Sequence, residues 1–198
     1  MLKRYKLPLL LALLLCLEGI IYLWAAWTVE DPDFIFEKCT RNSGRVSAAL
    51  NLMVLIMVGY YGLKKMYADN KLKNTFWKLM TLFAVNHIIH FFYIFNNFKS
   101  KEVELVLSEN KHGIITFIFI LLFPIILWAF KNLNKVLYWA IILHLFNVTS
   151  FMIKTFYGKI KPEKPAYLHQ MGIAIMGIIL IYILYRVVRE HRSKANLN

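Results

Sequence analysis

The chain has 198 residues, of which 59% are hydrophobic, and a formal net charge of +13. Water-soluble domains average about 45–50% apolar residues, so this composition excludes an ordinary soluble domain. The positive charge does not indicate a nucleic-acid partner, because the basic residues gather at the ends of apolar stretches and no nucleic-acid-binding motif is present. We therefore expect a lipid bilayer, not nucleic acid, to surround the protein.

Six apolar stretches are each long enough to cross a bilayer. A helix needs about 20 mostly apolar residues to span about 30 Å of hydrocarbon. In chain order, the expected spans cover residues 7–27, 46–63, 75–98, 113–130, 135–156 and 166–188. The connections between them are too short for a separate soluble domain. The sequence therefore predicts an all-α polytopic membrane protein, a bundle of six transmembrane helices that forms a single domain over residues 1–198.

The first span follows a basic N-terminal segment that resembles a signal peptide. Its apolar character continues to Trp27 without a small-residue cleavage triplet before an exposed segment, which favours an uncleaved helix. The next connection, residues 28–45, is the longest and is expected to be a loop near the membrane interface. Cys16 lies deep in the first span and Cys39 in this loop, so we expect no disulfide between them.

The later connections are short. Residues 64–74 form a polar loop, and residues 99–111 carry apolar residues at a spacing that allows a short amphipathic helix. Residues 132–134 are a tight linker that makes the fourth and fifth spans an antiparallel hairpin. The segment 159–165 contains two prolines, and Pro165 is placed to start the sixth helix.

The distribution of charge predicts the orientation. One side of the membrane, which holds both termini, carries 14 Lys and Arg residues with two acids, and the other carries 10 with eight acids. Because cytoplasmic segments are enriched in Lys and Arg, both termini are expected in the cytoplasm, most plausibly at a bacterial inner (plasma) membrane. The fifth connection, residues 159–165, is basic and lies on the side opposite the termini. It therefore reduces the difference in the number of Lys and Arg residues between the two sides.

Polar side chains recur inside the spans. A charge at the centre of a membrane helix costs about 2.5–3.5 kcal/mol, so such residues are expected to face the bundle interior. In the third span, Asn86, His90, Tyr93 and Asn97 follow one another at intervals of four, three and four residues, which places them on one stripe. His87 lies about 60° from His90 around the same helix.

Other spans supply further polar residues, between the middle of the membrane and its outer face. These are Glu18 in the first span, Asn51 in the second, His144 and Asn147 in the fifth, and His169 at the outer start of the sixth. At about 1.5 Å per residue, Glu18, His87 and His144 each lie within roughly 2 Å of the middle of their span. The sequence therefore predicts a polar pocket that opens outward and has these three residues at its floor.

Two interpretations of this pocket carry the most weight. The first is a hydrogen-bonded network that only joins helices, in which each polar pair contributes about 0.6–2 kcal/mol. The second is a cofactor site, either haem b on His144 with His87 or His90, or a divalent metal ion. The metal ligands would be His87, His90 and His144 with Glu18 or His169. Asn86, Asn147 and Asn51 would orient the imidazoles from outside the ligand set.

Two further interpretations remain open. Glu18 and the histidines would relay protons in a small-molecule or proton transporter or a lipid-handling protein. Alternatively, His144 would act as a base for the hydroxyl of Thr81 or Ser150 in an intramembrane enzyme, although no known catalytic motif is present. We expect binding of haem or metal for electron transfer or redox-complex assembly, with other membrane subunits as candidate partners. The sequence does not decide whether the protein is an enzyme.

Overall fold

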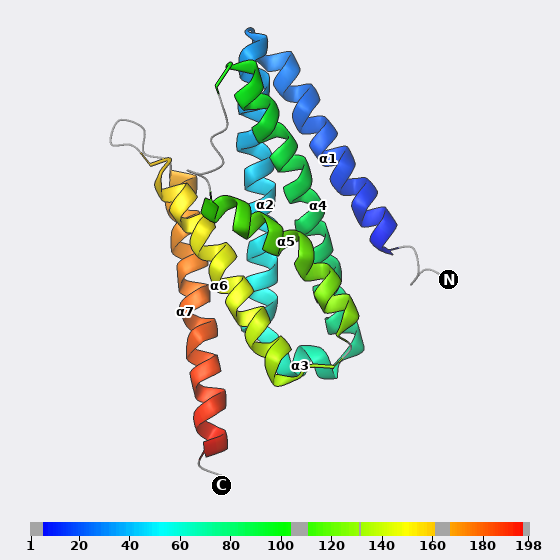
Figure 1. The fold of residues 1–198 in the computed structure, drawn as a ribbon, viewed down its shortest axis with the longest axis vertical. Coiled ribbons are helices and arrows are strands. Elements are labelled where there is room, and N and C mark those ends of the chain that lie inside the picture. The colour runs from blue at the N-terminus through cyan, green and yellow to red at the C-terminus, as the bar shows by residue number, and fades with distance from the viewer. Residues whose placement is uncertain (1–5, 104–110, 131, 161–166, 196–198) are drawn as a thin grey trace. The chain divides into compact units, whose positions relative to one another are not determined.

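The computed structural model describes residues 6–103, 111–130, 132–160 and 167–195, with side chains from Leu7 to Glu190 within these ranges (Figure 1). The described chain is helical and contains no strand, which confirms the predicted all-α class. The elements are α1 (Lys6–Thr28), the 3-10 helix η1 (Pro32–Phe34), α2 (Ile35–Tyr61), α3 (Leu63–Ala68), α4 (Asn70–Ser100), α5 (Lys111–Ala129), α6 (Lys135–Tyr157) and α7 (Tyr167–Ala195).

Six helices in these ranges are long and apolar enough to cross a membrane. They are Leu7–Thr28, Pro32–Tyr61, Asn70–Ser100, Lys111–Ala129, Lys135–Tyr157 and Tyr167–Glu190. Each corresponds to one expected span, and the starts or ends of most agree within a few residues. The chain is therefore a multi-pass membrane protein.

The predicted start of the second span is wrong. Helix α2 begins at Ile35, so most of the expected loop 28–45 is helical and only the short turn around η1 connects α1 to α2. In this turn, Asp31 is the N-cap of η1 and its carboxylate accepts a hydrogen bond from the Asp33 N–H at 3.0 Å. The helix was missed because its first three turns carry charged residues on the exposed face, which lowers the average hydropathy.

Other connections also differ from the expectation. The expected loop 64–74 is occupied by α3 and the first turn of α4, where the Asp69 carboxylate accepts a hydrogen bond from the Lys71 N–H at 2.7 Å. The expected amphipathic helix in residues 99–111 falls largely on residues 104–110, which lie outside the described residues, as does the predicted first-turn Pro165. Helix α7 continues beyond the predicted end at residue 188.

The chain divides into two compact units. The first unit comprises Met1–Leu50 and Lys78–Ile125, and the second comprises Asn51–Trp77 and Ile126–Asn198. Helices α2 and α4 contribute a segment to each unit, whereas α1 belongs to the first unit, and α6 and α7 belong to the second. The prediction of a single domain over the whole chain stays a prediction.

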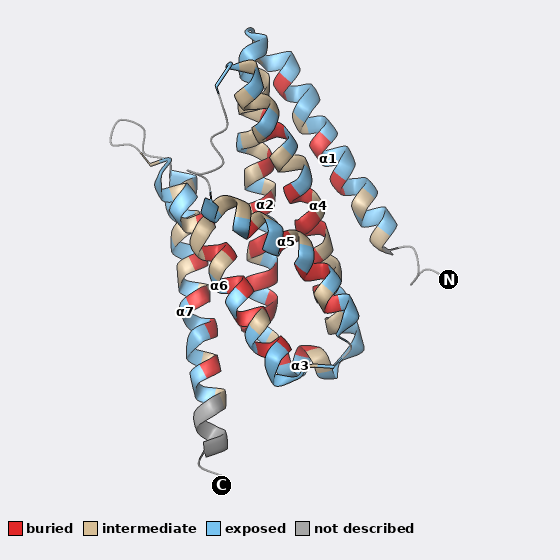
Figure 2. Cartoon of the chain, in the orientation of Figure 1, coloured by how far each residue is buried: buried red, intermediate tan, exposed pale blue. Residues whose placement is uncertain are grey.

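In the first unit, α1 packs against α2 and α4. Ala25, Cys39 and Tyr93 form a buried core cluster, and Ile21, Ile35, Phe36 and Ile89 pack around it. Most of the other side chains of α1 are exposed, as the pale blue of that helix shows (Figure 2). In a membrane these apolar side chains face lipid, so the association of α1 depends on close packing and on hydrogen bonds.

In the second unit, α6 packs against α7, and the end of α2 also contacts α7. The α-carbon of Gly59 faces Ile179 and Ile183, so a β-carbon there would lie 3.6 Å from Ile179. The ring of Phe156 approaches Gly172 and also meets the His169 ring, with a centroid distance of 4.9 Å. Small residues therefore let the helices approach closely, as is common in membrane bundles.

Candidate functional site

Two polar stripes run along α2 and α4 in the first unit. The α2 stripe comprises Glu37, Thr40, Ser43 and Ser47, at intervals of three, three and four residues. The α4 stripe comprises Asn86, His90, Tyr93, Asn97 and Lys101, the last just beyond the helix end, at intervals of four, three, four and four. These spacings keep each set on one helix face. We call these nine residues the polar seam.

The two stripes meet at both ends of the polar seam. At the end beside η1, the Lys101 ammonium contacts the Glu37 carboxylate, and Arg41 pairs with the other Glu37 oxygen at 3.0 Å. At the opposite end, the Asn86 amide nitrogen donates to the Ser47 hydroxyl at 2.7 Å and to the Ser43 carbonyl at 3.2 Å. The stripes are therefore joined by an ion pair at one end and by the two hydrogen bonds of the Asn86 amide at the other.

Between these joined ends lie buried polar atoms that complete no hydrogen bond of normal geometry among the described residues. They are the Thr40 Oγ1, Ser43 Oγ, Asn86 Oδ1, His90 Nδ1 and Asn97 Oδ1 atoms. A buried polar atom without a partner costs about 1–3 kcal/mol, so several in one place require an explanation. Ordered water or a bound polar ligand would satisfy them.

Glu18 approaches the middle of the polar seam from α1. Its side chain is 2% exposed, and neither carboxyl oxygen completes a hydrogen bond of normal geometry. The Ser43 hydroxyl is a close neighbour, and the carboxyl also interacts electrostatically with Cys39 and Tyr93. The Tyr93 hydroxyl donates to the backbone carbonyl of Glu18 at 3.1 Å, which fixes α1 against α4 at this level.

Glu18 forms no ion pair in the described part of the chain. The three ion pairs there involve Glu37 and Glu190 but not Glu18. A carboxylate in a membrane span without a counter-charge costs several kcal/mol, about 2.5–3.5 on insertion scales. The geometry therefore favours a positive species beside this carboxyl group.

Two of the predicted histidines belong to the same unit as Glu18. The His87 ring meets the Phe83 ring edge-on at a centroid distance of 4.5 Å and the His90 ring at 5.9 Å. The His90 ring packs against Gly44, where a β-carbon would lie 3.2 Å from its Cε1 atom. A glycine at position 44 is therefore what allows α2 to approach this imidazole.

The other predicted residues belong to the second unit. They are Asn51, His144, Asn147 and His169. His144 is 4% exposed, and the Asn51 amide donates to the Thr149 hydroxyl at 3.3 Å and to the Met176 sulfur at 3.9 Å. The predicted convergence of Glu18, His87 and His144 joins residues of different units and stays a prediction.

The predicted metal centre gains no support from the geometry. Within the described ranges, no group of three or more His, Cys, Asp and Glu residues is placed to hold a metal ion. The ligand set of His87, His90 and His144 with Glu18 or His169 also stays a prediction. The described neighbours of the Glu18 carboxyl are the Ser43 hydroxyl, the Cys39 thiol and Tyr93.

Sequence reasoning missed the α2 side of the site. The hydropathy average predicts a loop over Thr40 and Ser43, so it does not relate these residues to the α4 stripe. The signal was present in the spacing of Glu37, Thr40, Ser43 and Ser47, which repeats every three or four residues as a helix face does. Cys39, which is free and buried, was likewise assigned to the loop.

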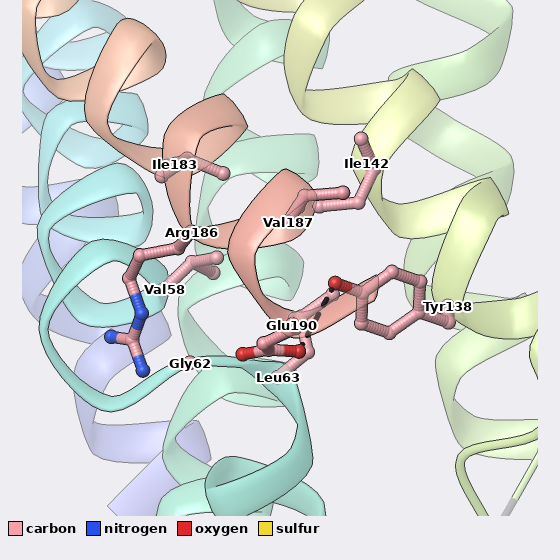
Figure 3. A pocket seen from close by; sticks show the side chains of 9 residues that line it. All are labelled: Val58, Gly62, Leu63, Tyr138, Ile142, Ile183, Arg186, Val187 and Glu190. Atoms are coloured by element: carbon pink, nitrogen blue, oxygen red, sulfur yellow. Dashed lines mark hydrogen bonds between the residues drawn. The ribbon is translucent and has the colours of Figure 1, made fainter. Parts of the chain in front are cut away.

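A separate polar junction lies in the second unit (Figure 3). The Arg186 guanidinium donates to the backbone carbonyls of Gly59 at 2.5 Å and Tyr60 at 3.0 Å, in the last turn of α2. Glu190, one turn further along α7, lies 3.4 Å from the Tyr138 hydroxyl and 3.4 Å from the Lys64 ammonium. The cavity between them measures about 10 Å³, room for about one water molecule, so this junction is structural.

Comparison of the chain with protein-family models, curated proteins and solved structures finds no match.

Proposed function

We propose that the protein binds a small cation, either a proton or a monovalent metal ion, at Glu18 and passes it across the membrane. The observation that carries this proposal is the buried Glu18 carboxyl, which has the Ser43 hydroxyl as its neighbour and forms none of the ion pairs of the described residues. An intramembrane acid in this state needs a positive partner. A mobile cation is a positive partner for the carboxyl group only while it is bound. Such reversible binding is what a transporter needs.

The surrounding atoms support the same ligand class. The Asn86 and Asn97 amide oxygens can only accept hydrogen bonds, and the Thr40 and Ser43 hydroxyls can direct their oxygens toward a cation. The polar seam therefore supplies several oxygen atoms that can accept, and Glu18 forms none of the ion pairs of the described residues. Oxygen donors of this kind suit hard cations, in contrast to the nitrogen and sulfur ligands of transition metals.

We further propose that the protein resides in the plasma membrane with both termini in the cytoplasm. The excess of Lys and Arg on the side of the termini supports this orientation. The turn that contains η1 then faces the outside, and so does the end of the polar seam that holds Glu37 and Lys101.

The test is cation uptake into liposomes that contain the purified protein. Radioactive sodium uptake and a pH-sensitive dye in the lumen distinguish a metal ion from a proton. We expect Glu18→Gln, which keeps the shape and removes the charge, to lower uptake about tenfold or more. Glu30→Gln, at an exposed acid, is the matched control and is expected to behave as the wild type. Equal uptake by wild type and Glu18→Gln would contradict the proposal.

A second candidate is haem b binding, supported by the low exposure of His144 at 4% and His87 at 9%. Haem b needs two axial imidazoles, and the sequence offers His144 with His87 or His90 for this role. In this case, the protein purified from haem-replete cells carries a Soret absorption band that His144→Ala abolishes and His112→Ala, at an exposed histidine, retains. Protein that contains no haem, with an unchanged spectrum in both variants, would remove this candidate.

A further inference from the structure

We propose that the cation reaches Glu18 from the η1 end of the polar seam, between Thr40 and Asn97, and that the Glu37–Lys101 ion pair closes this route. The inference rests on the proposed function, because it supplies the path to the same carboxyl group. It adds the direction of entry, the residues that line the path, and the contact that must open.

The order of residues along the two helices defines the path. Thr40 follows Glu37 by one turn of α2, and Asn97 precedes Lys101 by one turn along α4. The oxygen atoms of Thr40 and Asn97 that complete no hydrogen bond therefore lie at the level next to the ion pair. The next level along each stripe contains Ser43 and Tyr93, the two neighbours of Glu18. Unsatisfied oxygens thus continue from the ion pair to the carboxyl group.

The two ends of the polar seam differ in how easily they open. The side chains of Lys101 and Glu37 are 31% and 36% exposed, and an exposed ion pair contributes only about 0–1 kcal/mol. Asn86 at the other end is fully buried and donates two hydrogen bonds, which would both have to break without replacement by water. Entry from the η1 end is therefore the less costly route.

The contacts of Lys101 and Glu37 allow the ion pair that closes the route to open. Lys101 lies just beyond the end of α4, and its ammonium also lies 5.0 Å from the centre of the Phe34 ring. Glu37 keeps Arg41 as a second partner at 3.0 Å on its own helix. When Lys101 leaves, the Glu37 carboxylate therefore keeps Arg41 as its partner and stays at the mouth.

Cysteine accessibility tests the route without depending on transport. Thr40→Cys is made in a protein with Cys16→Ser and Cys39→Ala, and is treated with a membrane-impermeant trimethylammonium methanethiosulfonate on each side separately. The thiolate attacks the reagent's sulfenyl sulfur, forms a mixed disulfide and releases methanesulfinate. We expect reaction only from the η1 side, and at least fivefold faster when Lys101→Met is added. Asn97→Cys is expected to show the same pattern.

Two controls distinguish opening of the proposed route from a general increase in the accessibility of the protein. Ile88→Cys, on the exposed face of α4 at 52% exposure, is expected to stay unreactive in every background. Arg41→Met, which removes the other partner of Glu37, is expected to leave the Thr40→Cys rate unchanged. A Thr40→Cys thiol that Lys101→Met does not accelerate, or that reacts from the opposite side, would overturn the route. A third outcome is that the thiols react as expected but the Glu18→Gln variant takes up cations normally. This outcome would support the route and contradict the proposed function.

Discussion

Gly62→Ala is expected to lower the free energy of unfolding by about 3 kcal/mol, because two costs coincide at this position. Gly62 ends α2 with a φ of 75°, a conformation that residues with a β-carbon rarely adopt. A β-carbon there would also lie 2.6 Å from the Arg186 Nη2 atom and displace the guanidinium from the carbonyls that it caps. The measurement is SDS-titrated unfolding in mixed micelles, followed by circular dichroism.

A double-mutant cycle with Arg186→Met separates these two costs. Arg186→Met alone removes the charge-assisted hydrogen bonds to Gly59 and Tyr60, a loss of about 1.5–3 kcal/mol. In that background, Gly62→Ala retains only its backbone cost, so the two substitutions should be clearly less than additive. Strict additivity would show that Arg186 and Gly62 act independently, contrary to the geometry.

Asn86→Asp is expected to lower the free energy of unfolding by about 3 kcal/mol, more than Asn86→Leu does. Aspartate keeps the shape of asparagine but replaces the amide nitrogen that donates to Ser43 and Ser47 with an oxygen. A carboxylate oxygen would then face a carbonyl oxygen, and an acid would lie in the α4 span, which contains none.

Leucine provides the comparison that identifies the cause. Asn86→Leu loses both hydrogen bonds, about 2 kcal/mol in total, but it also removes the Asn86 Oδ1 atom, which completes no hydrogen bond. The same unfolding measurement should therefore rank the proteins as wild type, Asn86→Leu, Asn86→Asp in order of decreasing stability. If Asn86→Leu proves less stable than Asn86→Asp, the side chain stabilises the seam through its volume and not through its hydrogen bonds.

Much of the fold could be predicted because membrane spans have a strong compositional signal. Helices α1, α5 and α6 are apolar over most of their length, so their length and hydropathy locate both ends within about two residues. The start of α2 carries charged residues on one face, and an average over the window treats it as a loop. The helix was visible only as a repeat of three or four residues, which a hydropathy average does not measure.

The candidate site could be predicted only in part. Glu18, Asn86 and His90 were identified because polar groups are costly inside apolar spans, and Glu18 and Asn86 are indeed almost completely buried. Depth along a span does not give rotation about its axis, so the sequence could not say which neighbours each residue meets. Glu18 meets Ser43 and Tyr93, which depth alone did not select.

The position of the Arg186 guanidinium limits how α7 can move along α2. Its nitrogen atoms bond to consecutive carbonyls at the end of a helix, at 2.5 Å, 3.0 Å and 3.5 Å from Gly59, Tyr60 and Tyr61. A slide of α7 by a fraction of the 5.4 Å helical pitch would break these bonds, and the chain turns at Gly62 before a further set of carbonyls is reached. Translation of α7 along the end of α2 therefore costs these hydrogen bonds, and we expect these two helix segments to move together.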